Sequence, residues 1–191
     1  MTTVVGADGR VRCAWGSGSE EYIRYHDEEW GVPLHGDRAL FEKLSLEGFQ
    51  AGLSWITILK RRPAFRAAFH GFELDAVAAM TPDDAAALMD NPGIIRNRAK
   101  IEATISNARV ALELTAGSPG ALDELMWSFA PADRVRPAEV PAVTAESTAM
   151  SRELRRRGFR FVGPTTMYAL MQSAGMVDDH DPLCFRAGSA A

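Results

Sequence analysis

Apolar residues recur every three or four positions along most of this chain, which is the period of helices that pack on one face. The clearest stripes are formed by Ile101, Ile105, Ala108 and Leu112, and by Met167, Leu170, Met171 and Ala174. No stretch alternates apolar and polar residues over a length useful for a strand, and neither an internal repeat nor a low-complexity segment is evident. The pattern therefore predicts an all-α fold.

Capping residues and prolines indicate where these helices begin and end. Asp37 and Ser54 are placed to cap helices, and Thr81-Pro82 followed by two acidic residues is a typical helix start. The expected helices span residues 37–50, 54–69, 82–90, about 101–112, 118–127, 145–157 and 165–174, and a loop with three prolines spans 130–143. We expect one domain over residues 11–186, with a flexible N-terminal extension at 1–10 and a flexible tail at 187–191.

Length and composition fit a helical domain inside the cell. The 191 residues are 47% hydrophobic, which is enough for a sizeable core. No run approaches the roughly 18 uninterrupted apolar residues of a membrane span, and the first ten residues do not resemble a secretory signal. We therefore expect a cytoplasmic protein without membrane association. We also expect a monomer.

Basic residues gather in three clusters although the net charge is −4. The clusters are Lys60, Arg61, Arg62 and Arg66; Arg96, Arg98 and Lys100; and Arg152, Arg155, Arg156, Arg157 and Arg160. The net charge argues weakly against bulk coating of nucleic acid, but it does not exclude DNA binding. For any single cluster, a solvated helix face is the alternative interpretation.

A carboxylate interrupts an otherwise apolar helical stripe, which consists of Leu40, Leu44, Glu47 and Ala51. A lone carboxylate on such a face is costly unless a cation or several hydrogen-bond donors meet it. Gly48 and Gly52 are expected to break the helix, so that Ser54 caps a new helix that opens with Trp55.

Glu47 and Trp55 are thus expected on two sides of a glycine-lined bend. That arrangement suits a planar, positively charged ligand, because the indole stacks on the ring while the carboxylate pairs with its charge. In the alternative interpretation, Glu47 bonds Lys43, four residues earlier on the same face, and Trp55 is an ordinary core residue. Physical reasoning on these residues leaves both interpretations open.

The two cysteines lie at opposite ends of the chain, each near a histidine. Cys13 precedes His26 by thirteen residues, and His180 precedes Cys184 by four. Two cysteines and two histidines make a closed, tetrahedral zinc site without an open position for water. A Cys13–Cys184 disulfide or two unrelated thiols are the alternatives, and a structural disulfide is disfavoured in the cytosol. The other histidines, at positions 35 and 70, are expected at the surface or as caps.

A basic helix near the C-terminus ends on Gly158 and is followed by a short turn, after which Thr165 opens an apolar helix. A helix, a glycine-bearing hairpin and a second helix can hold a DNA phosphate, because backbone N–H groups at the second helix N-terminus face the anion. Such contacts do not need a high net charge. The alternative is a plain packing unit of two helices.

Together these segments resemble the DNA-3-methyladenine glycosylase I family of the helix-hairpin-helix superfamily, from about Arg12 to Cys184. The matching segments are 12–15, 25–33, 46–48, 50–57, 93–96, 127–129 and 157–163. The resemblance implies an all-helical, monofunctional enzyme that hydrolyses the N-glycosidic bond of 3-methyladenine in double-stranded alkylated DNA and leaves an abasic site. No motif places a lysine as a strand-cutting nucleophile.

The resemblance also implies roles for individual residues. The implied structural zinc joins the N- and C-terminal segments through Cys13, His26, His180 and Cys184. The implied base pocket has Glu47 as its catalytic residue, with substrate contacts from Tyr25, Trp55, Tyr22, Trp15 and Trp30. The implied DNA contacts are Gly52 and Leu53, which press into the duplex, and Gly163 and Thr165 of the hairpin.

Three features qualify the resemblance. About nine extra residues precede Cys13, and Phe49 stands where many relatives have a polar residue, which is expected to alter the pocket rim. Asp178 and Asp179 lie about where the wider superfamily has its catalytic aspartate. Neither is expected to be the base, because Asp179 directly precedes His180 and the cationic substrate base is already a good leaving group.

Two other functions stay open at this point. A zinc-bound helical DNA-binding module without catalysis would need the basic hairpin but not Glu47 or Trp55. A pocket for cationic purines unlinked to DNA would need the pocket but not the hairpin.

Overall fold

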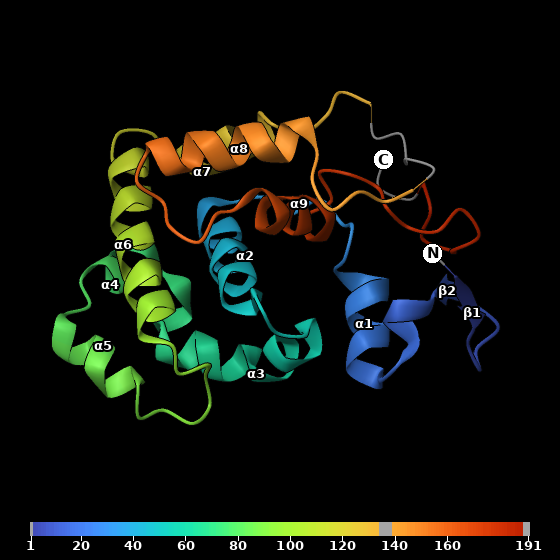
Figure 1. The fold of residues 1–191 in the computed structure, drawn as a ribbon, viewed down its shortest axis with the longest axis horizontal. Helices are drawn as coiled ribbons and strands as arrows, with labels where there is room; N and C mark the ends of the chain where they lie inside the picture. The colour runs from blue at the N-terminus through green and yellow to red at the C-terminus, as the bar shows by residue number, and fades with distance from the viewer. Residues whose placement is uncertain (1, 134–138, 189–191) are drawn as a thin grey trace.

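Helices dominate the computed structural model, which describes residues 2–133 and 139–188 (Figure 1). The short elements are β1 Thr3–Val5, β2 Val11–Cys13, and the 3₁₀ turns η1 Ala14–Ser17 and η2 His70–Phe72. The helices are α1 Glu20–Glu28, α2 Asp37–Gln50, α3 Trp55–Ala68, α4 Leu74–Ala78, α5 Pro82–Leu88, α6 Arg98–Thr115, α7 Ala121–Trp127, α8 Ala145–Arg156 and α9 Pro164–Ser173. The predicted helical class is confirmed. Residues 134–138 of the expected loop and 189–191 of the expected tail lie outside the described residues.

The N-terminal segment forms a small antiparallel ribbon that the sequence analysis did not predict. β1 pairs with β2, with Thr3 opposite Cys13. The buried guanidinium of Arg12 bonds both Asp8, in the turn, and Asp27, on α1. The expectation of no strand is wrong for residues 3–5, while the flexibility expected of residues 1–10 stays a prediction. Three-residue strands are too short to produce a recognisable alternation of apolar and polar residues.

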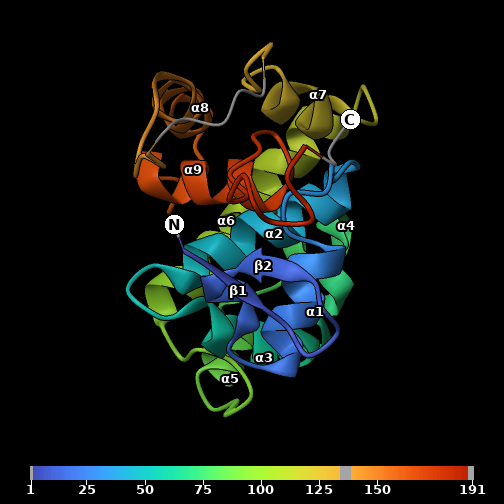
Figure 2. The ribbon, with the colours of Figure 1, turned by 90° about the vertical axis from the view of Figure 1, so that its right-hand side faces the viewer.

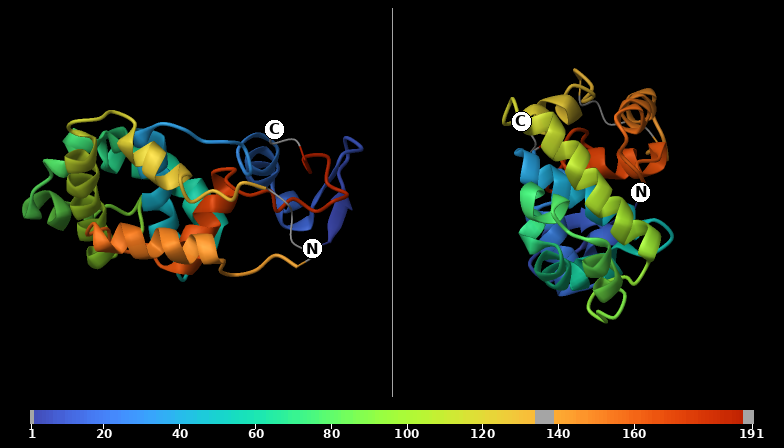
Figure 3. Two further views of the ribbon diagram at one scale, coloured as in Figure 1. Left: turned by 90° about the horizontal axis from the view of Figure 1, so that it is seen from above. Right: turned by 90° about the vertical axis from the view of Figure 1, so that its left-hand side faces the viewer.

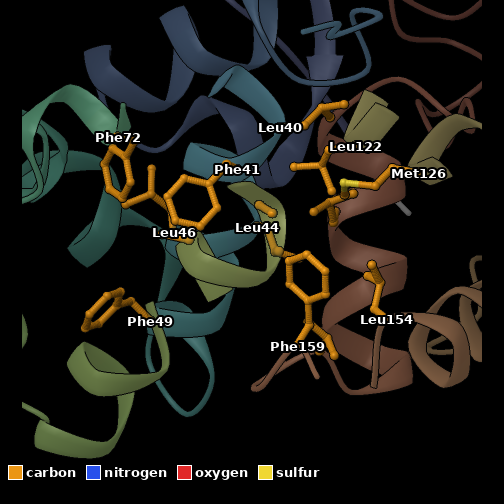
Figure 4. Packing of buried hydrophobic residues seen from close by; sticks show 14 of the residues in the cluster. Leu40, Phe41, Leu44, Leu46, Phe49, Phe72, Leu122, Met126, Leu154 and Phe159 are labelled. Carbon is orange, nitrogen blue, oxygen red and sulfur yellow. The ribbon is translucent and has the colours of Figure 1, made fainter. Parts of the chain in front are cut away.

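α2 is the central element of the core, and every residue from Leu40 to Phe49 is buried. Its side chains reach opposite sides, with Phe41 directed toward Phe72 and Leu40 toward Leu122 (Figure 4). Phe49 is 1% exposed, and its ring centroid lies 4.6 Å from that of Phe65. The predicted influence of Phe49 on a pocket rim is therefore wrong, since its side chain belongs to the core.

Several helix termini differ from the prediction. Asp37 does not cap its own helix; its carboxylate accepts hydrogen bonds from the backbone of Gly120 and Leu122 and so caps α7, which begins at Ala121 and not at 118. Ser54 occupies the N-cap position of α3, but its hydroxyl bonds the Thr57 side chain. The cap of α5 forms as expected at Thr81.

Glycine also acts differently from the prediction at the end of α2. The helix continues through Gly48 and ends at Gln50, before Gly52, whose φ is +85°. A Cβ on Gly48 would lie 3.5 Å from that of Phe161. Gly48 therefore does not break the helix, and a Cβ at this position would make an ordinary van der Waals contact with the segment between α8 and α9.

The two ends of the chain meet at the same end of the molecule. β1, β2 and α1 lie together there, and the segment after α9 returns to them (Figures 1 and 2). Viewed from above, this end lies opposite α4 to α6 (Figure 3). Within the described ranges, no helix combines the length and the apolar character needed to cross a bilayer.

Candidate functional site

Two cysteines and two histidines from the chain ends gather into one buried cluster. The four residues are Cys13, His26, His180 and Cys184, and their ligand atoms all lie within 4.8 Å of one another. Cys184 Sγ lies 3.4 Å from His26 Nε2 and 3.7 Å from His180 Nδ1. Sulfur and nitrogen ligands of one tetrahedral zinc are separated by about 3.5 Å, given the usual Zn–S and Zn–N bond lengths. The cluster could therefore hold a metal ion of this kind.

The surroundings of this Cys/His cluster hold its ligand atoms in place. His26 Nδ1 lies 2.8 Å from the Asp27 carboxylate, and His180 Nε2 lies 3.2 Å from the Trp30 carbonyl. The backbone N–H of Asp181 donates to Cys13 Sγ. Metal-binding histidines commonly use their second nitrogen in this way. Burial lowers the pKa of His180 to about 4 and so favours the neutral ring that binds metals. The cysteines are not joined by a disulfide.

A pocket of about 270 Å³ lies between α1, α2, α3 and α9. It is lined by all six residues that the sequence analysis placed in a pocket, namely Trp15, Tyr22, Tyr25, Trp30, Glu47 and Trp55. It is also lined by residues that the sequence analysis missed, namely Gln50, Ala169, Gln172 and Ser173. A ring of the size of adenine is flat, and both of its faces can stack on aromatic side chains. A pocket of this volume with an aromatic lining therefore suits such a ring.

The rings of this base-sized pocket hold each other at fixed angles. The centroid of Trp15 lies 4.9 Å from that of Trp30 in an edge-to-face contact, and the centroids of Tyr25 and Trp55 are 5.4 Å apart. The Tyr22 hydroxyl accepts a hydrogen bond from the backbone N–H of Ile56, which fixes the start of α3. Among the described residues, the buried Nε1 of Trp55 has no hydrogen-bond partner.

Glu47 brings a carboxylate into this apolar lining. Its side chain is buried, and Oε1 accepts a 2.9 Å hydrogen bond from the Ser173 hydroxyl. Burial raises the pKa of Glu47 to about 7, while the charge of Lys43 and the Ser173 hydrogen bond act in the opposite direction. A carboxylate with a single neutral donor keeps most of its capacity to accept hydrogen bonds from a ligand.

Lys43 lies behind the pocket wall. Its Nζ is 5.2 Å from the ring centroid of Tyr25 and 5.6 Å from that of Trp55, both within cation–π range. The side chain lines a neighbouring cavity of about 520 Å³ and not the base-sized pocket. Lys43 thus interacts with Glu47 by its charge, as the alternative interpretation expected in part, while Glu47 still faces the pocket and Trp55 still lines it.

The four residues predicted to contact DNA lie in two surface segments. Leu53 is 39% exposed and follows Gly52, which has a positive φ. Gly163 is the N-cap of α9, and no side chain occupies the cap. The first N–H groups of such a helix, including that of the exposed Thr165, have no partner within the helix.

Asp179 does not face the pocket. It is 1% exposed, and its Oδ2 accepts hydrogen bonds from the Tyr168 hydroxyl at 2.7 Å and from Gln172 Nε2 at 2.8 Å. Asp178 accepts from the backbone N–H of His180 and of Gly188. Neither carboxylate lines the pocket, and both bind groups of the protein, although the buried Oδ1 of Asp179 has no hydrogen-bond partner among the described residues; that neither is the base stays a prediction.

The geometry defines a helical protein in which an aromatic pocket with a buried carboxylate lies beside a Cys/His cluster. A family model described as methyladenine glycosylase matches residues 15–187. DNA-3-methyladenine glycosylase 1 of Escherichia coli (strain K12) is 46% identical over 174 residues, which are 88% of this chain and 92% of that protein.

Solved structures agree with this match. A crystal structure of 3-methyladenine DNA glycosylase I superimposes with a TM-score of 0.86 at 46% identity, covering 91% of this chain and 98% of that one. A tyrosine-to-phenylalanine variant of 3-methyladenine DNA glycosylase I in complex with 3-methyladenine gives 0.83 at 34% identity, covering 93% and 99%. The chain belongs to the methyladenine glycosylase family, and the family predicted from the sequence is confirmed.

Proposed function

We propose that this enzyme removes 3-methyladenine from alkylated duplex DNA by hydrolysing the N-glycosidic bond, leaving an abasic site in base excision repair. Its family membership supports this activity. The structural observation that carries it is the buried carboxylate of Glu47 inside an aromatic pocket of about 270 Å³. A DNA-binding module without catalysis would have no use for such a pocket.

Binding begins with extrusion of the damaged base from the stack, which is cheaper for a weakly paired lesion. Trp55 stacks on the ring, and base–aromatic stacking contributes on the order of 1–3 kcal/mol. Glu47 accepts hydrogen bonds from the amino edge of the adenine, and Tyr25 adds a polar contact. Trp15, Tyr22 and Trp30 enclose the ring. Because the Glu47 carboxylate accepts hydrogen bonds, it favours a cationic base whose edge carries an amino group. A base that presents a carbonyl oxygen at the same edge is disfavoured.

The chemical step uses the charge that methylation has placed on the base. As the bond between the sugar C1′ and the base nitrogen breaks, its electron pair neutralises the purine, which leaves as 3-methyladenine. Water then bonds to C1′ and loses its proton to solvent. Because the leaving group is good, positioning and desolvation of the extruded base are the main contributions of the protein. Lys43 lies behind the rings of Tyr25 and Trp55, so it is not placed as a nucleophile for strand cutting.

The Cys/His cluster fits one structural zinc ion, held by Cys13, His26, His180 and Cys184. The donor set, the separations of its ligand atoms and the hydrogen bonds to its surroundings support this assignment. Four protein ligands leave no open position for water, so the metal would stabilise the junction of the two chain ends. It would take no part in base release.

DNA contacts are assigned to two segments. Leu53, beside Gly52, fills the space that the extruded base vacates. The α8–α9 hairpin acts as a helix-hairpin-helix element, in which backbone N–H groups around Gly163 and Thr165 bind a phosphate. We further propose a cytoplasmic monomer with one domain over residues 11–186.

The direct test is incubation of the protein with methylated genomic DNA and chromatographic identification of the released bases. Release of 3-methyladenine is expected, and Glu47→Gln in the same assay is the matched control. Lys60→Gln, a change of an exposed α3 residue outside the pocket, should behave like the parent. Absence of 3-methyladenine release by folded parent protein would exclude the proposed activity.

A further inference from the structure

One face of α6 carries two buried polar residues that leave the helix to bond other segments. Lys100 is 8% exposed and Asn107 is 4% exposed. Seven residues are about two helical turns, so the two side chains leave the same face roughly 10 Å apart. Neither belongs to the pocket or to the Cys/His cluster.

Lys100 holds the end of α2. Its Nζ donates to the carbonyls of Phe49, at 2.9 Å, and Ala51, at 2.7 Å. The last carbonyls of a helix have no partner within it and carry the negative end of the helix dipole, so an ammonium group is well suited to them. Burial lowers the pKa of Lys100, which means that the cation is placed there at a cost. The segment that it fixes runs directly into Gly52 and Leu53.

Asn107 holds the hairpin between α8 and α9. Its Nδ2 donates to the carbonyl of Arg160 at 3.0 Å, and its Oδ1 accepts from the N–H of the same residue at 2.8 Å. The next residue, Phe161, has a φ of +57°, which is unfavourable for a bulky side chain, and is 39% exposed. Two hydrogen bonds from a buried amide to one residue keep this strained turn in a single conformation.

The hairpin that Asn107 holds also packs against α2, two residues before the helix end that Lys100 holds. A Cβ on Gly48 of α2 would lie in van der Waals contact with Phe161 of the hairpin. Each segment presents one apolar side chain to solvent, Leu53 in the first and Phe161 in the second. Both segments were assigned above to the DNA-binding face.

We propose that Lys100 and Asn107 are positioning residues for DNA, which hold the 51–54 loop and the 158–163 hairpin at the fixed spacing that the duplex requires. The inference rests on the proposed function, because it takes both segments as DNA contacts. Lys100 and Asn107 themselves are buried and act through the backbone that they bind. Their loss should therefore weaken duplex binding while binding of the free base is retained.

The test compares two ligands for each variant, an abasic-site duplex and free 3-methyladenine. Lys100→Met and Asn107→Leu remove the hydrogen bonds while keeping similar volume. Loss of two hydrogen bonds to a loop should weaken the duplex affinity about tenfold or more, with binding of the free base unchanged within about twofold. Thr104→Val is the matched control, because Thr104 is buried on the same face of α6 but bonds only Lys100 O of its own helix. Lys100→Arg should restore duplex binding.

Two results would overturn the inference. One is parent-like duplex affinity in the folded Met and Leu variants; the other is a parallel loss of free-base binding, which would make both residues general supports of the fold. If these variants do not fold, Lys100→Gln and Asn107→Asp are compared by the same two measurements.

The proposed function is tested separately, by base release from the parent. A parent that binds the abasic duplex but releases no base contradicts the function alone. A parent that does not bind the duplex contradicts the inference as well.

Discussion

The Cys/His cluster and the base-sized pocket share α1 but satisfy their polar groups in different ways. In the cluster, each histidine uses its outer ring nitrogen to bond a neighbouring group, His26 the Asp27 carboxylate and His180 the Trp30 carbonyl. Backbone N–H groups donate to both cysteine sulfurs. In the pocket, Glu47 is buried with one hydroxyl donor, and Trp55 Nε1 has no partner among the described residues.

This difference indicates that the Cys/His cluster serves stability and that the base-sized pocket serves ligand binding. Buried polar groups without partners cost free energy, and they persist where a ligand supplies what is missing. Under the proposed function, a metal ion would complete the cluster and the damaged base would complete the pocket. Variants of the cluster should therefore unfold the junction of the chain ends, and variants of the pocket should lower activity without loss of stability.

The largest effect is expected from removing one metal ligand. Cys184→Ser, or prolonged chelation of the parent, should release zinc and unfold the junction. A loss of about 4 kcal/mol, well below the roughly 10–16 kcal/mol of zinc-finger peptides, would lower Tm by roughly 8–16 °C in a chain of this size. Calorimetry with metal analysis measures both. His35→Ala, which changes an exposed histidine outside the cluster, is the control. Well under one zinc per chain in protein never exposed to chelator would contradict the assignment.

The second-largest effect is expected in the pocket, where a substitution should lower activity and leave stability unchanged or higher. Glu47→Gln should slow release of 3-methyladenine about a hundredfold, a typical cost of one preorganised polar group. Its Tm should match the parent near pH 5 and exceed it near pH 8. Burial raises the pKa of Glu47 to about 7, so the stability that the parent has below the ordinary pKa of this carboxyl is lost as pH rises through about 7.

Trp55→Ala should also slow release more than it destabilises the protein, because one side of Trp55 already faces the pocket. Excision at the parent rate by both Glu47→Gln and Trp55→Ala would mean that the pocket residues are assigned wrongly. If both variants simply unfold, the two residues are core residues, as the alternative interpretation of the sequence holds.

The sequence predicted the cluster more completely than the pocket, for a physical reason. Few residue types bind zinc, and the chain has only two cysteines, so Cys13 and Cys184 were conspicuous. The pocket aromatics were found from the family resemblance. Gln172 and Ser173 were not assigned to the pocket, because a glutamine or serine in a helical stripe carries no sign of what lies across from it. Their contacts exist only once α1, α2 and α9 pack together.

The helical class could be predicted because the apolar period repeats over long segments. The strand at Thr3–Val5 could not, since three residues show no period. The capping of α7 by Asp37, more than eighty residues away in sequence, was equally invisible, because local capping rules assign a carboxylate to its own helix. In each case the missing information is a contact between distant parts of the chain.

A third, smaller effect concerns the charge of Lys43. Base release should rise with pH through about 7, as Glu47 ionises. Besides burial, two neighbours act on the pKa of this carboxyl: Lys43 on the same helix and Ser173 of α9. Lys43→Met removes the positive charge that lowers the pKa of Glu47, so the midpoint should move upward, and release at pH 7 should fall by up to about tenfold. Single-turnover rates measured from pH 5 to 9 give both values.

Lys43→Arg keeps the charge and should retain a midpoint near that of the parent, whereas Lys60→Met removes an exposed charge and should leave the profile unchanged. A Lys43→Met profile that superimposes on that of the parent would show that the cation does not control Glu47. A rise of base release through about pH 7 that persists in Glu47→Gln would assign the ionisation to another group.

The smallest effect is expected from the two aspartates beside the cluster. Asp178 accepts hydrogen bonds from the backbone of His180 and Gly188, and Asp179 is buried against Tyr168 and Gln172. Neither faces the pocket, and the cationic base reduces the need for a strongly activated water. Asp178→Asn should therefore excise 3-methyladenine within about threefold of the parent rate, and Asp179→Asn should lose zinc or stability before it loses chemistry. Single-turnover excision rates of both variants, measured at matched zinc content, test these expectations. A fall of about a hundredfold or more in either variant, with zinc and fold intact, would restore that aspartate as the general base, and the separation between a structural cluster and a catalytic pocket would no longer hold.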